Sequence, residues 1–202
     1  MKNISILFFY LLVVGCEVEN NNDLNYDSNW ETLPAPVAPD SMVKHDDVFF
    51  VNEQKGWLVT RNGQIYNTLD GGESWNLQFE DDIYWRCVGF ADELHGWAGN
   101  KLGDNGKLLY QTTDGGNTWS EHVFYTAGQS AEFGGYSTQG IGFINKDIGW
   151  MGSYVKQPTL MTLDGGVTWS ESDFGAHVNR IRFLSNNLGY ASGKTVYKYA
   201  SD

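Results

Sequence analysis

An aspartate, two glycines and a tryptophan recur in one frame three times along this chain. The three boxes run from Asp70 to Trp75, from Asp114 to Trp119 and from Asp164 to Trp169. A glycine followed by an aromatic residue recurs in the same way, as Gly56-Trp57, Gly96-Trp97, Gly149-Trp150 and Gly189-Tyr190. Because a whole unit recurs and not only a turn, the sequence predicts an array of four repeats with three complete boxes.

Each repeat has the pattern of four short strands. A β-rich run at 48–51 precedes the glycine-aromatic pair, and a second run at 57–60 follows it. A turn at Asn62-Gly63 leads to a third run at 64–68, and a fourth run extends over 75–79. Four antiparallel strands per repeat are typical of a propeller blade. We therefore expect an all-β fold, a β-propeller of four blades with four strands each.

The last repeat stops short of its box. Residues 196–199 align with 65–68, so Asp202 stands where a fourth box begins. Near the other end, residues 29–33 resemble 74–78 but have no further strands before them, and Trp30 precedes Trp75 by one repeat period. An unpaired sheet edge is a liability for a folded chain. We expect the N-terminal strand to complete the last blade and close the ring.

The boxes are expected to be structural and not catalytic. Glycine supplies the positive φ of a tight turn, and the aspartate accepts hydrogen bonds from the amides of that turn. The tryptophan then packs its ring between neighbouring strands. The residues given this role are Asp70, Gly72, Trp75, Asp114, Gly116, Trp119, Asp164, Gly166 and Trp169.

The first residues have the pattern of a lipoprotein signal peptide. A weakly basic start precedes an apolar run at 4–14, which ends in Val13-Val14-Gly15-Cys16. The run is too short to span a bilayer, which takes about 20 residues. We expect a signal peptide at 1–15, lipidation of Cys16, an acidic and asparagine-rich tether at 16–28, and the propeller domain at 29–202. An ordinary cleaved signal with an incidental cysteine is the other interpretation. The expected location is the bacterial cell envelope, lipid-anchored to the outer membrane on its periplasmic or surface side.

Charge and cysteine content exclude several functions. The chain has 13 basic and 25 acidic residues and a formal net charge of −12, which disfavours nucleic acid as a partner. Apart from Cys16 the only cysteine is Cys87, so we expect no disulfide and a small buried thiol at that position. No recognised metal-ligand spacing is present, and we expect neither a metal nor a cofactor.

The boxes, with Thr68-Leu69 or Thr112-Thr113 before them, resemble the BNR or Asp-box repeat. With the frame from Phe90 to Gly96-Trp97, the unit is most similar to the photosystem II assembly factor-like propellers. The resemblance covers the whole domain and implies a propeller fold with its boxes on the face away from the ligand site. Proteins with such boxes include sialidases, glycan hydrolases, receptors and assembly factors, so the motif indicates fold more than function.

Candidate binding residues lie in the loops at the opposite face. Seven of the eight tryptophans belong to the repeat frame, and Trp85 is the exception. Aromatic and arginine side chains on one rim are typical of protein interfaces and of sugar-binding platforms. We expect the rim to hold Trp85, Arg86, Asp82, Tyr84, Tyr136, Phe133 and Arg180. The other interpretation of Trp85 is that it only caps the hydrophobic channel.

Two functions remain open. The first is a non-enzymatic, membrane-anchored scaffold that binds or assembles a protein partner in the cell envelope, acting as a monomer. The second is a glycan-binding or degenerate sialidase-like propeller. A sialidase needs three arginines around a carboxylate, and Arg180-Ile181-Arg182 lacks the proline of the family's element. Adjacent carboxylates such as Asp46-Asp47 point oppositely on a strand, so no complete catalytic set is expected.

Overall fold

The computed structural model describes residues 30–36, 44–100, 109–122, 138–153 and 158–201. The chain divides into two units, Met1–Thr32 and Leu33–Asp202. In the first unit, the described residues 30–32 form neither helix nor strand, and the Trp30 side chain is 86% exposed. All the strands lie in the second unit, and the description below concerns that unit alone.

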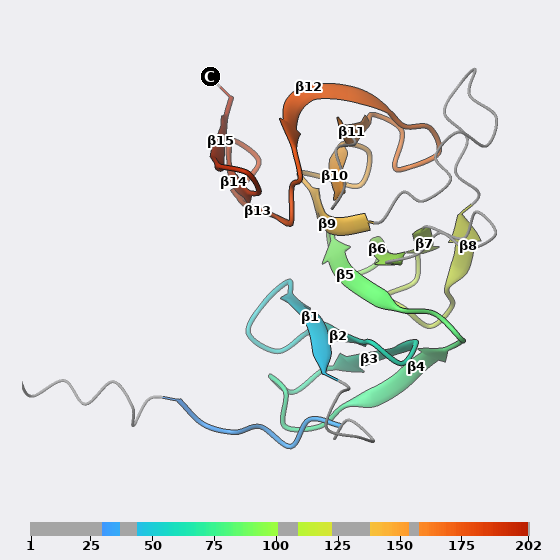
Figure 1. Ribbon diagram of the computed structural model, residues 1–202. Helices are drawn as coiled ribbons and strands as arrows, with labels where there is room; N and C mark the ends of the chain where they lie inside the picture. Colours follow the sequence, from blue (N-terminus) through green and yellow to red (C-terminus); the bar gives the residue numbers. More distant parts are fainter. Residues whose placement is uncertain (1–29, 37–43, 101–108, 123–137, 154–157, 202) are drawn as a thin grey trace, which may run out of the picture. The chain divides into compact units, whose positions relative to one another are not determined.

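The second unit consists of four antiparallel sheets that follow the four repeats (Figure 1). The first sheet contains β1 (His45–Phe50), β2 (Gly56–Thr60), β3 (Gln64–Thr68) and β4 (Asn76–Glu80). The second contains β5 (Trp85–Phe90), β6 (Gly96–Asn100), β7 (Leu109–Thr112) and β8 (Ser120–His122). The third contains β9 (Thr138–Phe143), β10 (Gly149–Ser153), β11 (Pro158–Thr162) and β12 (Ser170–Ala176), and the last contains β13 (Arg180–Ser185), β14 (Leu188–Ser192) and β15 (Val196–Ala200). The predicted all-β, four-bladed propeller is confirmed.

The last sheet differs from the prediction in one respect. It has three strands, in the order β13-β14-β15, and residues 30–36 are not paired as a fourth. Within 33–36, Pro34 and Pro36 carry no amide hydrogen, which weakens any strand pairing there. Leu33 instead packs on the first sheet, so close to Gly72 that a Cβ at Gly72 would lie 2.7 Å from the leucine Cδ1.

The strand registers define two ends of each sheet. In the first sheet His45 faces Thr60 and Gln64 faces Glu80 at one end, which we call the loop end. At the other end, which we call the box end, Gly56 pairs with Thr68. The three boxes all follow their third strands at the box end. The predicted rim residues that the structure describes, Asp82, Tyr84, Trp85, Arg86 and Arg180, belong to the loop end.

The glycine before each aromatic residue is explained by a close aromatic contact. A Cβ at Gly96 would stand 2.3 Å from the Phe90 ring, and one at Gly56 would stand 2.7 Å from Phe50. The same pairing joins Gly149 to Phe143 and Gly189 to Phe183. Each first strand therefore lays its phenylalanine across a glycine of the second strand, and no larger residue fits there.

The sheets are joined by stacked aromatic rings. Trp57 stacks on Phe90 of the next sheet with ring centroids 3.4 Å apart, and Trp97 stacks on Phe143 at 3.5 Å. Both indole nitrogens also donate a hydrogen bond to a box glycine of the next sheet, at 3.3 Å. The third junction is looser, because Trp150 and Phe183 are 5.4 Å apart and tilted by 34°.

The boxes have one geometry in three copies. In the second sheet the Thr112 hydroxyl donates to Asp114 at 2.8 Å and accepts from the Gly116 amide at 2.8 Å. The amide and hydroxyl of Thr118 donate to the same aspartate. The corresponding bonds recur around Asp70 and Asp164, and both box glycines have φ between 70° and 102°.

Those hydrogen bonds set the ionisation of the box carboxylates. Donation from the Ser74 hydroxyl and amide lowers the pKa of Asp70 to about 2. The Thr118 hydroxyl and amide lower the pKa of Asp114 in the same way. For Asp164, partial burial acts to raise the pKa, but the bonds from Thr168 and Thr162 outweigh it. A carboxylate that is ionised and accepts hydrogen bonds from its own turn fits the structural role expected for the box aspartates.

Among the described residues no helix reaches the length and hydrophobicity that a membrane crossing requires.

Candidate functional site

The loop end brings together side chains from the first, second and last sheets. Tyr84 immediately precedes β5, Arg86 is its second residue, and Arg180 begins β13. Asp82 is exposed in the turn before β5, where its amide bonds to Asp81. Four of the predicted rim residues are therefore at the expected end. Phe133 and Tyr136 fall outside the described residues.

Trp85 is not a surface residue. Its side chain is 0% exposed and packs edge-on against Tyr110 at 5.1 Å and Phe79 at 6.0 Å. Residues 84–86 alternate in direction along the start of β5, so the partly exposed Tyr84 and Arg86 flank a buried ring. The expectation that Trp85 is presented on the rim is wrong. Trp85 lies in the core between the first and second sheets.

Tyr84 forms the centre of a small basic and aromatic group. The Arg61 guanidinium lies over the Tyr84 ring at 4.7 Å, and Arg86 lies 5.9 Å from the same ring. Arg61 is exposed, and its amide bonds to the carbonyl of Lys44, whose side chain is 65% exposed. Guanidinium groups over a tyrosine face combine charge and apolar surface in one place. We call Lys44, Arg61, Tyr84 and Arg86 the basic rim.

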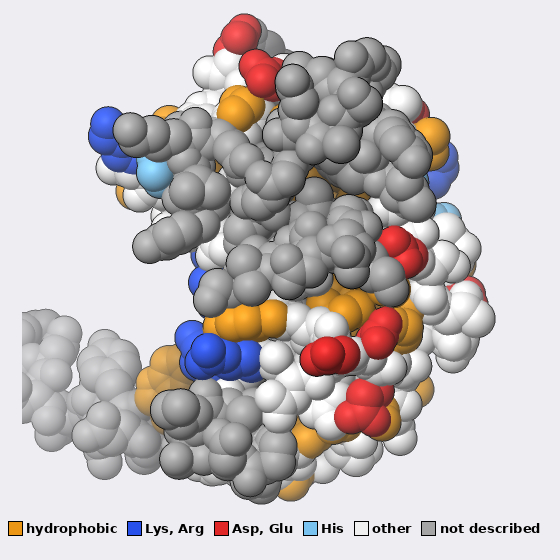
Figure 2. Space-filling model, turned by 45° about the vertical axis from the view of Figure 1, so that its right-hand side comes forward, with side chains coloured by type: hydrophobic (Ala, Val, Ile, Leu, Met, Phe, Trp, Pro, Cys, Tyr) orange, Lys and Arg blue, Asp and Glu red, His pale blue; other side chains and the backbone are white. Residues whose placement is uncertain are grey.

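A depression of about 460 Å³ adjoins the basic rim. Its lining includes Arg61 and Tyr84 together with the acidic residues Glu80 and Asp82. Figure 2 shows one group of Lys and Arg side chains with Asp and Glu side chains nearby, and further basic side chains elsewhere on the visible face. A surface of mixed charge beside an aromatic ring can orient a polar segment of a partner.

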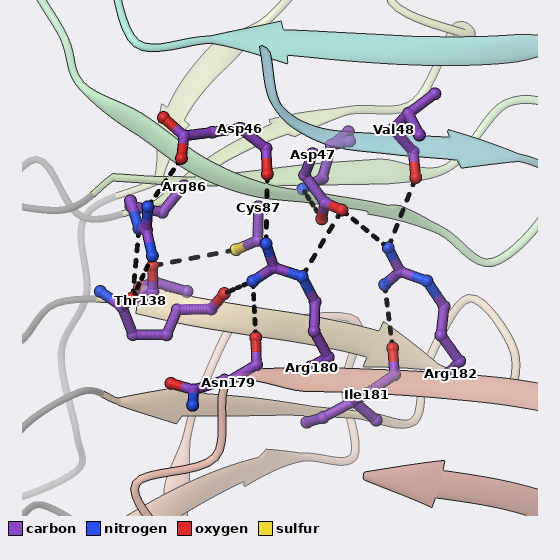
Figure 3. Close-up of polar contacts among 12 residues, drawn as sticks. Asp46, Asp47, Val48, Arg86, Cys87, Thr138, Asn179, Arg180, Ile181 and Arg182 are labelled. Carbon is purple, nitrogen blue, oxygen red and sulfur yellow. Dashed lines mark hydrogen bonds and ion pairs between the residues drawn. The ribbon is translucent and has the colours of Figure 1, made fainter. Parts of the chain in front are cut away.

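Behind the rim, Arg86 reaches across the channel between the first strands. Its Nη1 atom donates to Asp46 Oδ1 at 2.6 Å, and its Nε and Nη2 atoms donate to Gln139 Oε1 at 3.1 and 2.8 Å (Figure 3). The Asp46 side chain is 0% exposed, and its Oδ2 has no hydrogen-bond partner. One guanidinium thus joins the first, second and third sheets.

Two further arginines join the last sheet to the first. Arg180 donates to the Asp46 carbonyl at 3.1 Å, and Arg182 donates to Asp47 Oδ1 at 2.9 Å. Asp47 Oδ2 also accepts from the Val88 amide of the second sheet. Figure 3 shows these residues converging between β1 and β13. The junction between the last and first sheets is therefore made by charged groups, unlike the stacked aromatic junctions.

The channel cluster carries an excess of positive charge. Three guanidinium groups, of Arg86, Arg180 and Arg182, face the two carboxylates of Asp46 and Asp47. The Lys44 ammonium adds a fourth cation 3.4 Å from Asp46. In a chain with a formal net charge of −12, this loop end is a local site of positive potential, which attracts anionic groups.

Cys87 lies beneath this cluster and is buried. Its side chain is 0% exposed, as expected, and burial raises the pKa of its thiol to about 12, with Asp47 adding to the rise. The adjacent carboxylates of Asp46 and Asp47 are both bound by arginines. Among the described residues no group of His, Cys, Asp and Glu side chains is arranged to hold a metal ion.

The sequence analysis did not predict that one site would contain Lys44, Asp47, Gln139 and Arg182. The sequence analysis considered Asp46 and Asp47 as a possible catalytic pair and not as partners of these arginines. A signal was available, because Asp46-Asp47, Arg86 and Arg180-Ile181-Arg182 all lie at the start of a first strand. First strands meet at the channel of a propeller, so opposite charges at that one position indicate a shared cluster.

The comparisons with known proteins agree with the fold. The profile of a family described as Photosynthesis system II assembly factor YCF48 matches residues 22–121. The Photosystem II assembly lipoprotein Ycf48 of Synechococcus sp. (strain CC9902) is 31% identical over 216 residues, which covers 96% of this chain and 60% of the relative. The chain therefore spans about three fifths of the length of that relative.

Solved structures are similar in fold at low sequence identity. One titled YCF48 bound to D1 peptide has a TM-score of 0.52 and 19% identity, and the match covers 77% of this chain and 53% of that one. The computationally designed Ika4 protein has a TM-score of 0.54 and 12% identity, with 82% of this chain and 96% of that one covered.

The four sheets, the repeated boxes and the matches to known proteins together place this protein in the class of β-propellers built from repeated boxes. The resemblance predicted from the repeat is confirmed. The chain is similar to the photosystem II assembly factor-like propellers.

Proposed function

We propose that this protein is a non-enzymatic propeller that binds a segment of another protein at its loop end. The basic rim carries the proposal, because Arg61 and Arg86 lie over Tyr84 and Lys44 is hydrogen-bonded to Arg61 through its carbonyl, in a chain with a formal net charge of −12. Arginine and tyrosine are the residue types enriched at the energetic centres of protein interfaces. At the box end the aspartates of the three boxes accept hydrogen bonds from their own turns.

The chemistry of the rim favours a segment that carries a carboxylate. A side-chain or C-terminal carboxylate pairs with Arg61 and Lys44, while an apolar group beside it packs on Tyr84. Asp46 and Asp47 hold Arg86 and Arg182 inside the protein, whereas Arg61 and Lys44 are exposed at the surface. A solved relative is titled as bound to a D1 peptide, which supports peptide recognition as a function of this class.

The proposal includes a lipid anchor at Cys16. The sequence 13–16 fits a lipoprotein processing site, and the relative from Synechococcus is named a lipoprotein. Two acyl signals hold a protein on a membrane more firmly than the single chain that gives marginal binding. A monomeric propeller tethered in the cell envelope could then hold its protein partner beside the membrane.

The glycan alternative gains no support from the site. It depended on Trp85 stacking a sugar ring, and that side chain is 0% exposed. Tyr84, the aromatic residue beside it on the rim, has the Arg61 guanidinium over its face. Likeness to glycoside hydrolases at 15% identity or less concerns the fold alone.

Site-specific photo-crosslinking tests the proposal. A photo-reactive residue is introduced in place of Arg61, and in a matched variant in place of Lys146, a basic side chain at the box end that is 58% exposed. Both variants are expressed in the native membrane and irradiated, and the crosslinked proteins are identified by mass spectrometry. We expect a discrete partner to be captured from position 61 and not from position 146. Equal capture at the two positions, or capture at 146 alone, would contradict binding at the loop end.

A further inference from the structure

The exposed apolar side chains of the second unit are unevenly divided between the two ends of the sheets. At the box end, large apolar side chains that are at least 50% exposed lie in or next to the boxes and near the ends of the first strands: Leu69, Leu94, Leu163, Val167 and Leu184. At the loop end the described residues include one such side chain, that of Val196 at the start of β15. A concentration of exposed apolar groups at one end of a fold indicates a contact surface.

The box ends of the four sheets form one face. Residues at or just beyond the ends of all four first strands line a depression of about 360 Å³, among them Phe50, Ala91, Ile144 and Leu184. The boxes lie beside the turns that follow the first strands, because the Gly115 amide donates to the Leu94 carbonyl at 2.9 Å, and corresponding bonds occur in the first and third sheets. The exposed apolar side chains therefore belong to one face, around one mouth of the channel.

The polypeptide enters this unit at the same face. Leu33 is the first residue of the unit, and its side chain packs against Gly72 of the first box. Residues 17–32 alone separate Leu33 from Cys16, the expected site of the acyl anchor. An anchored chain is therefore attached to the propeller at the box end, and a lipid surface is the apolar phase within reach of these side chains.

The charges of the box end determine which lipid surface it fits. Asp70, Asp114 and Asp164 stay ionised beside the apolar residues, because they accept hydrogen bonds from their own turns. The ammonium group of a zwitterionic headgroup attracts these carboxylates, whereas an anionic headgroup repels them. Apolar side chains are stabilised when they leave water for the boundary between headgroups and acyl chains. The face thus fits a zwitterionic lipid layer better than an anionic one.

We propose that the box end is a membrane-contact surface that lies on zwitterionic lipid headgroups, with its exposed apolar side chains inserted at the boundary with the acyl chains. The residues inserted are Leu69, Leu94, Leu163, Val167 and Leu184. The contact rests on the acyl anchor proposed for Cys16, because a few apolar side chains bind a lipid surface weakly and the anchor keeps them beside it.

This contact turns the loop end away from the membrane. β5 runs from the loop end to the box end in 6 residues, and a strand rises about 3.3 Å per residue, so the basic rim stands about 20 Å from the lipid surface. A partner bound at the rim therefore presents a segment at that height and not a segment embedded in the lipid.

Fluorescence of the lipidated full chain on vesicles tests the proposal. Leu163→Cys at the box end and Val196→Cys at the loop end are each labelled with nitrobenzoxadiazole, a dye that reports the polarity around it. Both positions are exposed, so neither substitution disturbs the core. The natural cysteines stay unlabelled, because Cys16 carries the acyl group and Cys87 is buried. The proteins are bound to phosphatidylcholine vesicles with and without nitroxide-labelled lipid as a quencher, and flotation of the vesicles measures anchoring separately.

We expect both proteins to float with the vesicles, and we expect a blue shift and nitroxide quenching at position 163 and neither at position 196. Adding Leu69→Ser and Leu184→Ser to the protein labelled at 163 should reduce the quenching and leave flotation unchanged, because the anchor remains. Phosphatidylglycerol in place of phosphatidylcholine should also reduce the quenching at 163.

Flotation without quenching at 163, or equal quenching at 163 and 196, would overturn the membrane contact and leave the anchor and the loop-end binding intact. Unchanged quenching in the serine variant would overturn the part given to the apolar side chains, and stronger quenching on phosphatidylglycerol would overturn the part given to the carboxylates. Absence of flotation would overturn the anchor and the contact together.

Discussion

At the box end of the propeller three turns of one sequence are held by one set of hydrogen bonds, whereas the described turns of the loop end differ from sheet to sheet. The box aspartates are occupied by the threonine or serine of their own turns. At the loop end Arg61, Arg86 and Arg180 each contact a different sheet or a different partner. The repeated end therefore accounts for the fold, and the unrepeated end is where function can vary without loss of the fold.

The largest loss of stability is expected from substitutions in the stacked aromatic junctions between the sheets. Trp97→Ala removes a ring that is 0% exposed, its stack on Phe143 and its bond to Gly165. Removing a buried large side chain costs about 3–5 kcal/mol of unfolding free energy. Denaturant unfolding checks this value. Trp150→Ala in the looser third junction should cost less, and an equal or larger loss there would contradict the difference between the junctions.

A smaller loss is expected from Asp47→Ala in the channel cluster. The substitution leaves Arg182 and the Val88 amide without their carboxylate. Removing one partner of a buried ion pair costs about 3–5 kcal/mol, but the Arg182 side chain is 35% exposed to water, so we expect about 2 kcal/mol. Thermal unfolding measures it. Asp147→Ala, in an exposed pair with Lys146, serves as the control and should leave the melting temperature nearly unchanged.

A still smaller loss of unfolding free energy is expected from substitution of the box threonine. Thr112→Val keeps the shape of the side chain but removes the hydroxyl that serves Asp114 and the Gly116 amide. An amide left without its partner costs about 1–3 kcal/mol. The neighbouring Thr113→Val is the comparison, because Thr113 is exposed. Similar unfolding free energies for the two variants would mean that the box hydrogen bonds do not stabilise the turn.

The box carboxylates predict a loss of stability in acid. Their pKa values are lowered in the folded chain, to about 2 for Asp70, so the unfolded chain binds protons first as the pH falls. Their contribution is complete above the unfolded pKa of about 4 and is lost between about pH 4 and pH 2. Unfolding midpoints measured across this range should fall less steeply for Asp70→Asn than for the natural chain. Identical slopes would count against the hydrogen-bonded boxes.

The smallest effect on stability is expected at the basic rim. Arg61 is exposed, and surface substitutions of this kind usually change the unfolding free energy by about 0.5 kcal/mol or less. Arg61→Ala should therefore unfold like the natural chain in the same denaturant series. A loss comparable to that of Thr112→Val would assign Arg61 to the fold and not to binding.

The fold was predictable from the sequence because its parts repeat. The close contact of Phe90 with Gly96 recurs at the same positions in every repeat. The hydrogen bonds of the box from Asp114 to Trp119 recur in each complete box. The site was less predictable because it has one copy of each part. Trp85 was misassigned since alternation at the start of β5 turns it inward between Tyr84 and Arg86. Arg182 and Asp47 are 135 residues apart in the sequence, so their pairing could be predicted only from their shared position at the start of a first strand.

The most direct test is the affinity of the propeller for the partner segment captured at position 61, measured by isothermal titration calorimetry. The double variant Arg61→Ala with Tyr84→Ala should bind about tenfold or more weakly, because both residues supply the exposed charge and aromatic face of the rim. Lys146→Ala, at the box end, should bind like the natural chain. Unchanged affinity in the rim variant, or a comparable loss in Lys146→Ala, would contradict the assignment of binding to the loop end.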